Sequence, residues 1–86
     1  MEADKLNVFP SPASDYVSLQ LELESSADEV SVGILDIMGK LVQTRTLNNV
    51  QNETTQFDVS DLSSGTYFMS VITPEGFRSV KFTVAK

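Results

Sequence analysis

The amino-acid sequence predicts an all-β domain, an immunoglobulin-like antiparallel β-sandwich of about seven strands. Apolar and polar residues alternate in several segments of the chain, which is the period of a strand with one buried and one solvated face. Polar turn segments separate these runs at roughly the 8–12-residue spacing that is typical of sandwiches. No helical period competes with this alternation.

The first expected strand is a short one around Val8. Residues 16–24 follow, with an apolar residue at every second position. The alternation returns over residues 30–34, after a polar segment at residues 25–28 that has the composition of a turn. We therefore expect the first three strands to be separate.

The middle of the chain predicts two more strands. Residues 36–40 form a turn signal with a glycine near its end. A fourth strand is expected over residues 40–47, followed by a polar loop at 48–52, and a fifth strand is expected over residues 54–59.

The last two strands form a predicted hairpin. The strand that begins near Tyr67 has apolar residues on both faces, which predicts a central position in the sheet. Residues 73–76 place proline early and glycine late, as a hairpin turn requires. The last strand, over residues 79–84, alternates again, and we expect it at a sheet edge.

Composition limits the partners and the compartments. The chain has 12 acidic and 6 basic residues, a net charge of −6. Nucleic acid and anionic membrane surfaces are therefore unfavourable partners. There is no cysteine and no apolar run long enough to insert into a membrane. The acidic start is unlike a signal peptide, and we interpret residues 1–5 as a linker remnant with a methionine added by cloning.

Catalytic chemistry lacks the necessary residue types. Without histidine, serines such as Ser11, Ser63 and Ser64 have no usual general base, although a serine–lysine pair stays possible in principle. Asp58 and Asp61 lack the spacing of a calcium loop and suit turn capping better. The absence of tryptophan argues against a sugar-binding face. We predict no enzyme activity, no cofactor and no metal site.

The most informative segment is residues 61–68, a polar turn followed by a glycine and an aromatic strand. Gly65 suits a tight turn at the start of a strand. Tyr67 has a hydroxyl group that needs a backbone partner. A tyrosine bonded back to an upstream turn is a feature of immunoglobulin-type sandwiches.

Four segments of the chain carry motifs in a fixed order. The opening motif, at residues 8–13, contains Pro10 and Pro12; an Asp-x-x-Gly-Lys motif follows at Asp36, Gly39 and Lys40; a Leu-x-x-Gly-x-Tyr motif follows at Leu62, Gly65 and Tyr67; and the terminal strand covers residues 79–86. Together these segments resemble the C-terminal sorting domains of the type IX secretion system of some Gram-negative bacteria. Ser11 stands where this family usually has asparagine. The resemblance spans residues 6–86, which we predict to be one sorting domain, and we predict the residues of the first three motifs to maintain the fold.

The resemblance implies a seven-stranded immunoglobulin-like fold and the function of an export signal. The domain would be recognised in the periplasm by outer-membrane translocon and shuttle proteins and would carry its cargo to the cell surface or the medium. In many cargos of this family, a surface sortase then cuts upstream and attaches the cargo to lipopolysaccharide. The resemblance leaves the cargo and the oligomeric state open.

An edge strand offers free backbone groups for docking, so we expect the terminal strand to carry the recognised surface. Lys81 and Lys86 are the favoured contacts, and the apolar side chains of this strand are expected in the core. The expected recognition residues are Lys81, Phe82, Thr83, Val84, Ala85 and Lys86. The alternative function is an accessory module for spacing, sugar binding or protein binding, and an enzyme is the third candidate.

Overall fold

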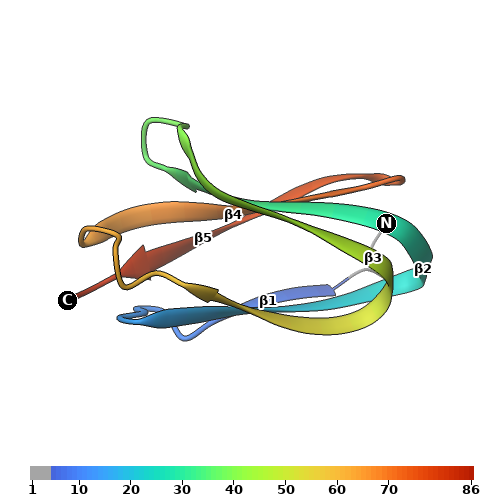
Figure 1. Ribbon diagram of the computed structural model, residues 1–86, viewed down its shortest axis with the longest axis horizontal. Coiled ribbons are helices and arrows are strands. Elements are labelled where there is room, and N and C mark those ends of the chain that lie inside the picture. The colour runs from blue at the N-terminus through green and yellow to red at the C-terminus, as the bar shows by residue number, and fades with distance from the viewer. Residues whose placement is uncertain (1–4) are drawn as a thin grey trace.

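The computed structural model describes residues 5–86 as one antiparallel sheet of five strands (Figure 1). The strands are β1 (Lys5–Phe9), β2 (Tyr16–Asp36), β3 (Leu41–Asp58), β4 (Gly65–Thr73) and β5 (Gly76–Val84). In this described part, no helix has the length and apolarity to cross a membrane. Of the predicted linker remnant 1–5, residues 1–4 lie outside the described residues, and Lys5 begins β1.

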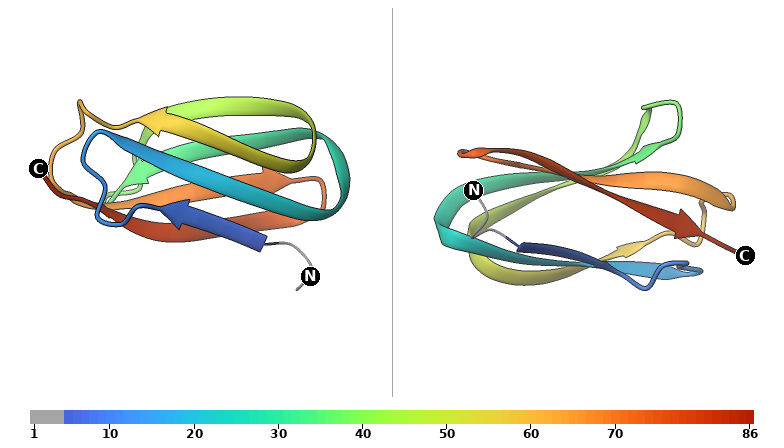
Figure 2. Two further views of the ribbon diagram at one scale, coloured as in Figure 1. Left: turned by 90° about the horizontal axis from the view of Figure 1, so that it is seen from below. Right: turned by 180° about the vertical axis from the view of Figure 1, so that it is seen from behind.

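The sheet has the order β1-β2-β4-β5, and β3 also pairs with β2. The first half of β2 lies between β1 and the second half of β3, whereas its second half lies between the first half of β3 and β4. Both long strands bend between their halves. The sheet therefore curls over into two facing layers (Figures 1 and 2).

The predicted all-β antiparallel class is confirmed, but the predicted immunoglobulin-like sandwich of about seven separate strands is not, because the described residues form one curled sheet of five strands. The expected turn at 25–28 and the expected loop at 48–52 both lie inside strands, within β2 and β3. A register shift between Glu22 and Ala27 bends the β2–β3 pair without ending it. Beyond the shift, Ala27 pairs with Val50 and both are buried. Local polarity predicted breaks here, but burial of these two side chains keeps the strands continuous.

The predicted hairpin at the end of the chain is confirmed. β4 lies between β2 and β5, and β5 ends the sheet at an edge. Thr73 pairs with Gly76 across the turn. On β4, Tyr67, Met69 and Val71 are buried, whereas Ile72 on the opposite face is exposed.

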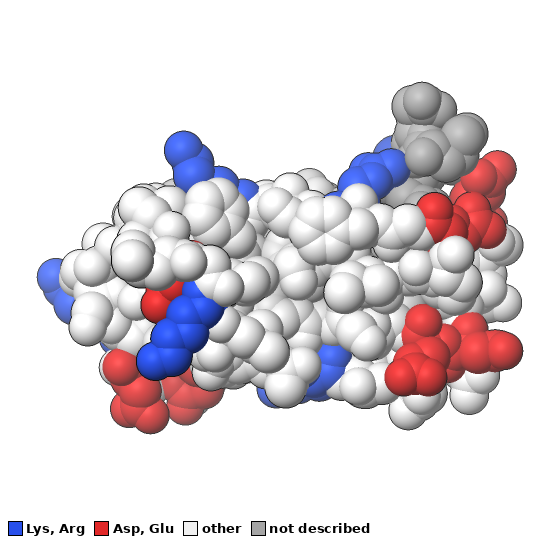
Figure 3. Space-filling model, turned by 90° about the horizontal axis from the view of Figure 1, so that it is seen from above, with Lys and Arg blue, Asp and Glu red and all other residues white. Residues whose placement is uncertain are grey.

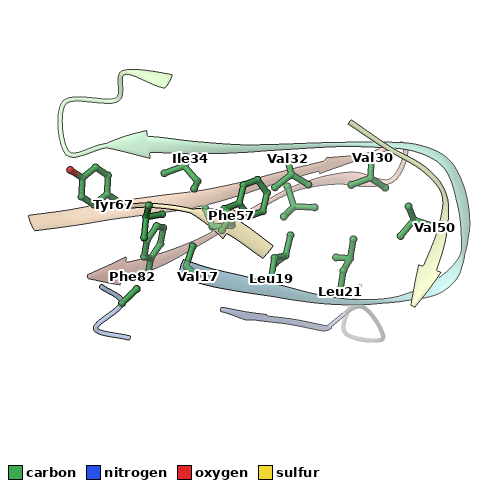
Figure 4. Close-up of a cluster of buried hydrophobic side chains, with 14 of the residues drawn as sticks. Val17, Leu19, Leu21, Val30, Val32, Ile34, Val50, Phe57, Tyr67 and Phe82 are labelled. Carbon is green, nitrogen blue, oxygen red and sulfur yellow. The ribbon is translucent and has the colours of Figure 1, made fainter. Parts of the chain in front are cut away.

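The core fills the space between the two layers (Figure 4). Its largest fully buried side chains are Phe57 from β3 and Phe82 from β5. Leu19 and Leu21 lie on the first half of β2, in the same layer as Phe57, and Ile34 lies on the second half of β2. Both halves of one strand thus contribute to one core, so its stability depends on the bend.

The turn between β2 and β3 explains the Asp-x-x-Gly-Lys motif. The Asp36 carboxylate oxygen Oδ1 accepts hydrogen bonds from the backbone N–H groups of Met38 and Lys40, both at 2.9 Å. Asp36 and Lys40 also bond through their backbones, at 2.9 Å. Gly39 has φ = +85°, a conformation that is costly for a residue with a Cβ atom. Three positions of the motif thus form one local turn.

The turn before β4 explains the Leu-x-x-Gly-x-Tyr motif. The Tyr67 hydroxyl donates a 2.8 Å hydrogen bond to the carbonyl oxygen of Ser63, which confirms the predicted tie to the upstream turn. The Tyr67 ring stacks on Phe82 with centroids 6.0 Å apart. Leu62 packs against the core, and Gly65, at φ = +156°, begins the strand.

We predict that Phe57→Ala lowers the free energy of unfolding by about 3–5 kcal/mol, because it leaves a cavity between the layers. Guanidinium unfolding followed by circular dichroism measures the loss. Phe77→Ala is the control, since this ring is 64% exposed and its loss changes stability by less than about 1 kcal/mol. Equal losses in the two variants would contradict the assignment of the core.

We also predict that Gly39→Ala lowers the free energy of unfolding by about 1–2 kcal/mol, because alanine resists a positive φ. No atom lies within 4 Å of the added methyl group, so the loss comes from the backbone alone. Met38→Ala is the matched control in the same turn, with a side chain that is 87% exposed. The same unfolding measurement applies, and a neutral Gly39→Ala would refute the explanation of the motif.

Candidate recognition site at the last strand

β5 presents two different faces along the edge of the sheet. Phe82 and Val84 point into the core and are buried. Lys81 and Thr83 alternate with them and are exposed on the outer face. Of the predicted recognition residues, the apolar pair is therefore core, as expected, and the polar pair is accessible.

A short segment from the start of the chain covers one end of the β5 edge. The Ala13 N–H donates to the Thr83 carbonyl at 2.8 Å, and the Ala85 N–H donates to the Ala13 carbonyl at 2.8 Å. The Thr83 N–H donates to Ser11 Oγ at 3.3 Å. We call residues 11–13 the strap. It includes Pro12 and follows Pro10, so the opening motif of the chain holds the terminal strand in place.

The chain end is fastened by a second set of contacts. The Lys86 ammonium donates to the carbonyl oxygens of Val59 at 3.1 Å and Ser60 at 2.8 Å. The Lys86 N–H donates to Ser64 Oγ at 3.0 Å. Lys86, expected from the sequence to be a contact for the secretion machinery, thus binds the turn that precedes β4.

Asp58 organises the turn that receives Lys86. Its Oδ1 accepts hydrogen bonds from the Ser60 hydroxyl at 2.6 Å and the Ser60 N–H at 2.9 Å. The hydrogen bond from the Ser60 hydroxyl is the main cause that holds the pKa of Asp58 below its ordinary value, and the bond from the Ser60 N–H adds to it. The positive charge of Lys86 acts on this pKa in the same direction. The turn-capping role predicted for Asp58 is therefore the observed one.

The charged side chains of the described residues are spread over the surface (Figure 3). Within residues 5–86 no group of three or more metal-binding side chains comes together. Uncharged side chains fill the middle of the face in Figure 3, and acidic side chains gather toward the two ends of the long axis. Such a surface can dock another chain through shape, hydrogen bonds and single charges.

The strap and Ser64 are contributors that sequence reasoning missed. Ser11 and Thr83 lie 72 positions apart, and Ser64 and Lys86 lie 22 apart. No local pattern connects residues at such separations. The one available signal was the position of Ser11 between two prolines. It indicated a motif but did not indicate that this motif would bond to the terminal strand.

The solved structure reported as the crystal structure of dimeric latent PorU from Porphyromonas gingivalis has the same fold. It superposes with a TM-score of 0.73 at 19% sequence identity over 95% of this chain. The chain spans only 9% of the length of that PorU chain, so this similarity concerns the fold. No curated protein matches the sequence significantly.

A family model described as a secretion system C-terminal sorting domain matches residues 7–85. The matched region contains the strap, the two motif turns and nearly all of the terminal strand. It confirms the resemblance that the motifs indicated. The chain therefore belongs to the family of C-terminal sorting domains, the signals that direct proteins into type IX secretion.

Proposed function

We propose that the folded domain is recognised in the periplasm through the surface formed by residues 81–86. The proposed partners are the outer-membrane translocon and the shuttle proteins of the type IX system. The cargo then reaches the cell surface or the medium. A surface sortase cuts upstream of the domain and attaches the cargo to lipopolysaccharide.

The family match over residues 7–85 is the observation that carries this proposal. The edge position of β5 supports the choice of surface, because an edge strand has backbone groups available to a partner. Three of the six basic residues, Arg78, Lys81 and Lys86, lie in this last part of an acidic domain. We assign the direct contact to Lys81, since Lys86 holds the chain end.

The domain is proposed to be a signal without catalytic activity. Sorting domains of this family are non-catalytic signals. The serines considered as nucleophiles support this view, because Ser11 and Ser64 accept hydrogen bonds from backbone N–H groups of the terminal segment. At Ser63 the backbone carbonyl, and not the side-chain hydroxyl, accepts the hydrogen bond from the Tyr67 hydroxyl. Of these three serines, only Ser11 and Ser64 therefore use their hydroxyls in contacts that maintain the fold.

Deleting the terminal strand is a poor test of this proposal. Phe82 and Val84 are buried in the core, so their removal unfolds the domain as well as removing a contact. Surface substitutions separate the two effects. Lys81 is exposed on the outer face, and Lys81→Glu reverses its charge without touching the core.

We predict that residues 1–86, fused behind a periplasmically targeted fluorescent reporter, send most of the reporter out of a host with a working type IX system. Lys81→Glu should leave most of the reporter in the periplasm, because the domain then lacks the positive charge that contacts the partner. Cell fractionation and reporter fluorescence measure the distribution. Lys5→Glu is the matched control, a charge reversal on an exposed lysine of β1 that lies outside the motifs.

The reporter without the domain must stay in the periplasm. Equal export with and without the domain would contradict the sorting function. Export of the intact domain and of Lys81→Glu alike would keep the function and remove Lys81 from the recognised surface.

A further inference from the structure

The outer edge of β5 is divided into a closed part and an open part. β4 pairs with β5 along its whole length, from Gly65 opposite Val84 to Thr73 opposite Gly76. On the other side, the strap bonds only to the end of the strand, at Thr83 and just beyond it. Among the described residues, no strand pairs with that side of β5 before residue 83.

The direction of the backbone groups identifies which residues are open. In an antiparallel pair, successive residues point their N–H and C=O groups alternately toward the partner strand and away from it. Thr83 directs both groups at the strap, so they point away from β4. The register of β4 and β5 has no shift. Lys81, Ser79 and Phe77 therefore direct their N–H and C=O groups to the open side.

The side chains around this open stretch have a definite chemistry. On the outer face, Phe77 lies opposite Ile72 of β4, and both are exposed. A hollow of about 140 Å³ adjoins the same end of β5 and has a mixed lining, with Leu6, Leu23 and Val71 on its apolar part and Thr73, Glu75 and Arg78 on its polar part. β5 contains two basic residues and no acidic one, and its Lys81 is exposed on the outer face.

We propose that the β5 edge from Phe77 to Lys81 is the docking site for an extended acidic segment of a partner protein, which adds to the sheet as a strand. This inference rests on the proposed sorting function and names the chemistry of the partner. Five residues of β5 span about 17 Å, enough to pair with a short strand. Alternate side chains of the added strand face the hollow and the outer face, where acidic groups meet Lys81.

A second copy of the domain is the less suitable occupant. The local charge of the β5 edge, and not the net charge of the domain, separates the two occupants. Pairing two β5 edges brings two basic strands together. An acidic segment of another protein instead complements the strand that it joins.

The export assay with a proline substitution tests the docking edge. Ser79→Pro removes an N–H group on the open side and leaves the pairing with β4 intact, as proline on an edge strand allows. The first half of β3 forms the other edge of this layer. Thr46 of β3 lies opposite Ser31 of β2, whose own backbone groups point toward β4, so the N–H of Thr46 points away from the sheet. Thr46→Pro is therefore the matched control at another edge of the same layer.

We expect Ser79→Pro to reduce export of the reporter fusion at least about fivefold, because the loss of one hydrogen bond lowers the affinity for the partner by about this factor. Thr46→Pro should export normally, and circular dichroism should report both variants as folded. Lys81→Arg should keep export and Lys81→Glu should lose it. This pair tests the acidic partner even if Ser79→Pro does not fold.

Two further measurements can overturn the inference independently. In the isolated domain, the amide hydrogens of Ser79 and Lys81 should exchange with solvent much faster than those of Val80 and Phe82, which face β4. Similar exchange rates would mean that the edge is not open. Sedimentation of the intact chain as a dimer that Ser79→Pro dissociates would make a second copy the occupant.

The outcomes also separate this inference from the proposed function. No export of the intact domain would refute the sorting function itself. Normal export of the intact domain, Ser79→Pro and Lys81→Glu would keep the sorting function and refute the docking edge.

Discussion

The bend of the paired strands β2 and β3 is the constraint on which the rest of the structure depends. At the bend, Ala27 pairs with Val50 and both side chains are buried, while the polar residues around them stay outside. The bend sends the second half of each strand back over the first, so that a single sheet provides both walls of the core. The other elements then have defined positions: β1 lies beside one half of β2, β4 lies beside the other half, and β5 lies on the far side of β4.

The terminal strand combines core packing with an unpaired edge. Its inward side chains complete the space between the layers, and the strap and the Lys86 contacts fasten its end. The stretch from Phe77 to Lys81 keeps backbone groups directed away from β4. The docking strand that we propose is also a core strand, so its edge exists in this form only when the domain is folded.

Much of the fold followed from the sequence, because strand alternation and turn chemistry are local signals. The central position of β4, the hairpin at its end, and the bond of Tyr67 to the upstream turn were all predicted correctly. The strand count was not, because the segments around Ala27 and Val50 are locally polar and their continuity depends on burial in the core. The position of the last strand at the edge was also predictable. The strap and the contacts of Lys86 were not, since they join residues far apart in the chain.

The hydrogen bonds between the strap and the terminal strand have a consequence for biosynthesis. Residues near the beginning of the domain close the fold by bonding to residues near its end, so the chain cannot complete its core until the last strand has left the ribosome. Contacts between such distant residues also form late and slowly during folding. A cargo whose translation stops before β5 lacks Phe82 and Val84 and exposes an unfinished core. The closed fold is therefore complete only in a chain synthesised through the last strand, so a truncated copy of the domain lacks it.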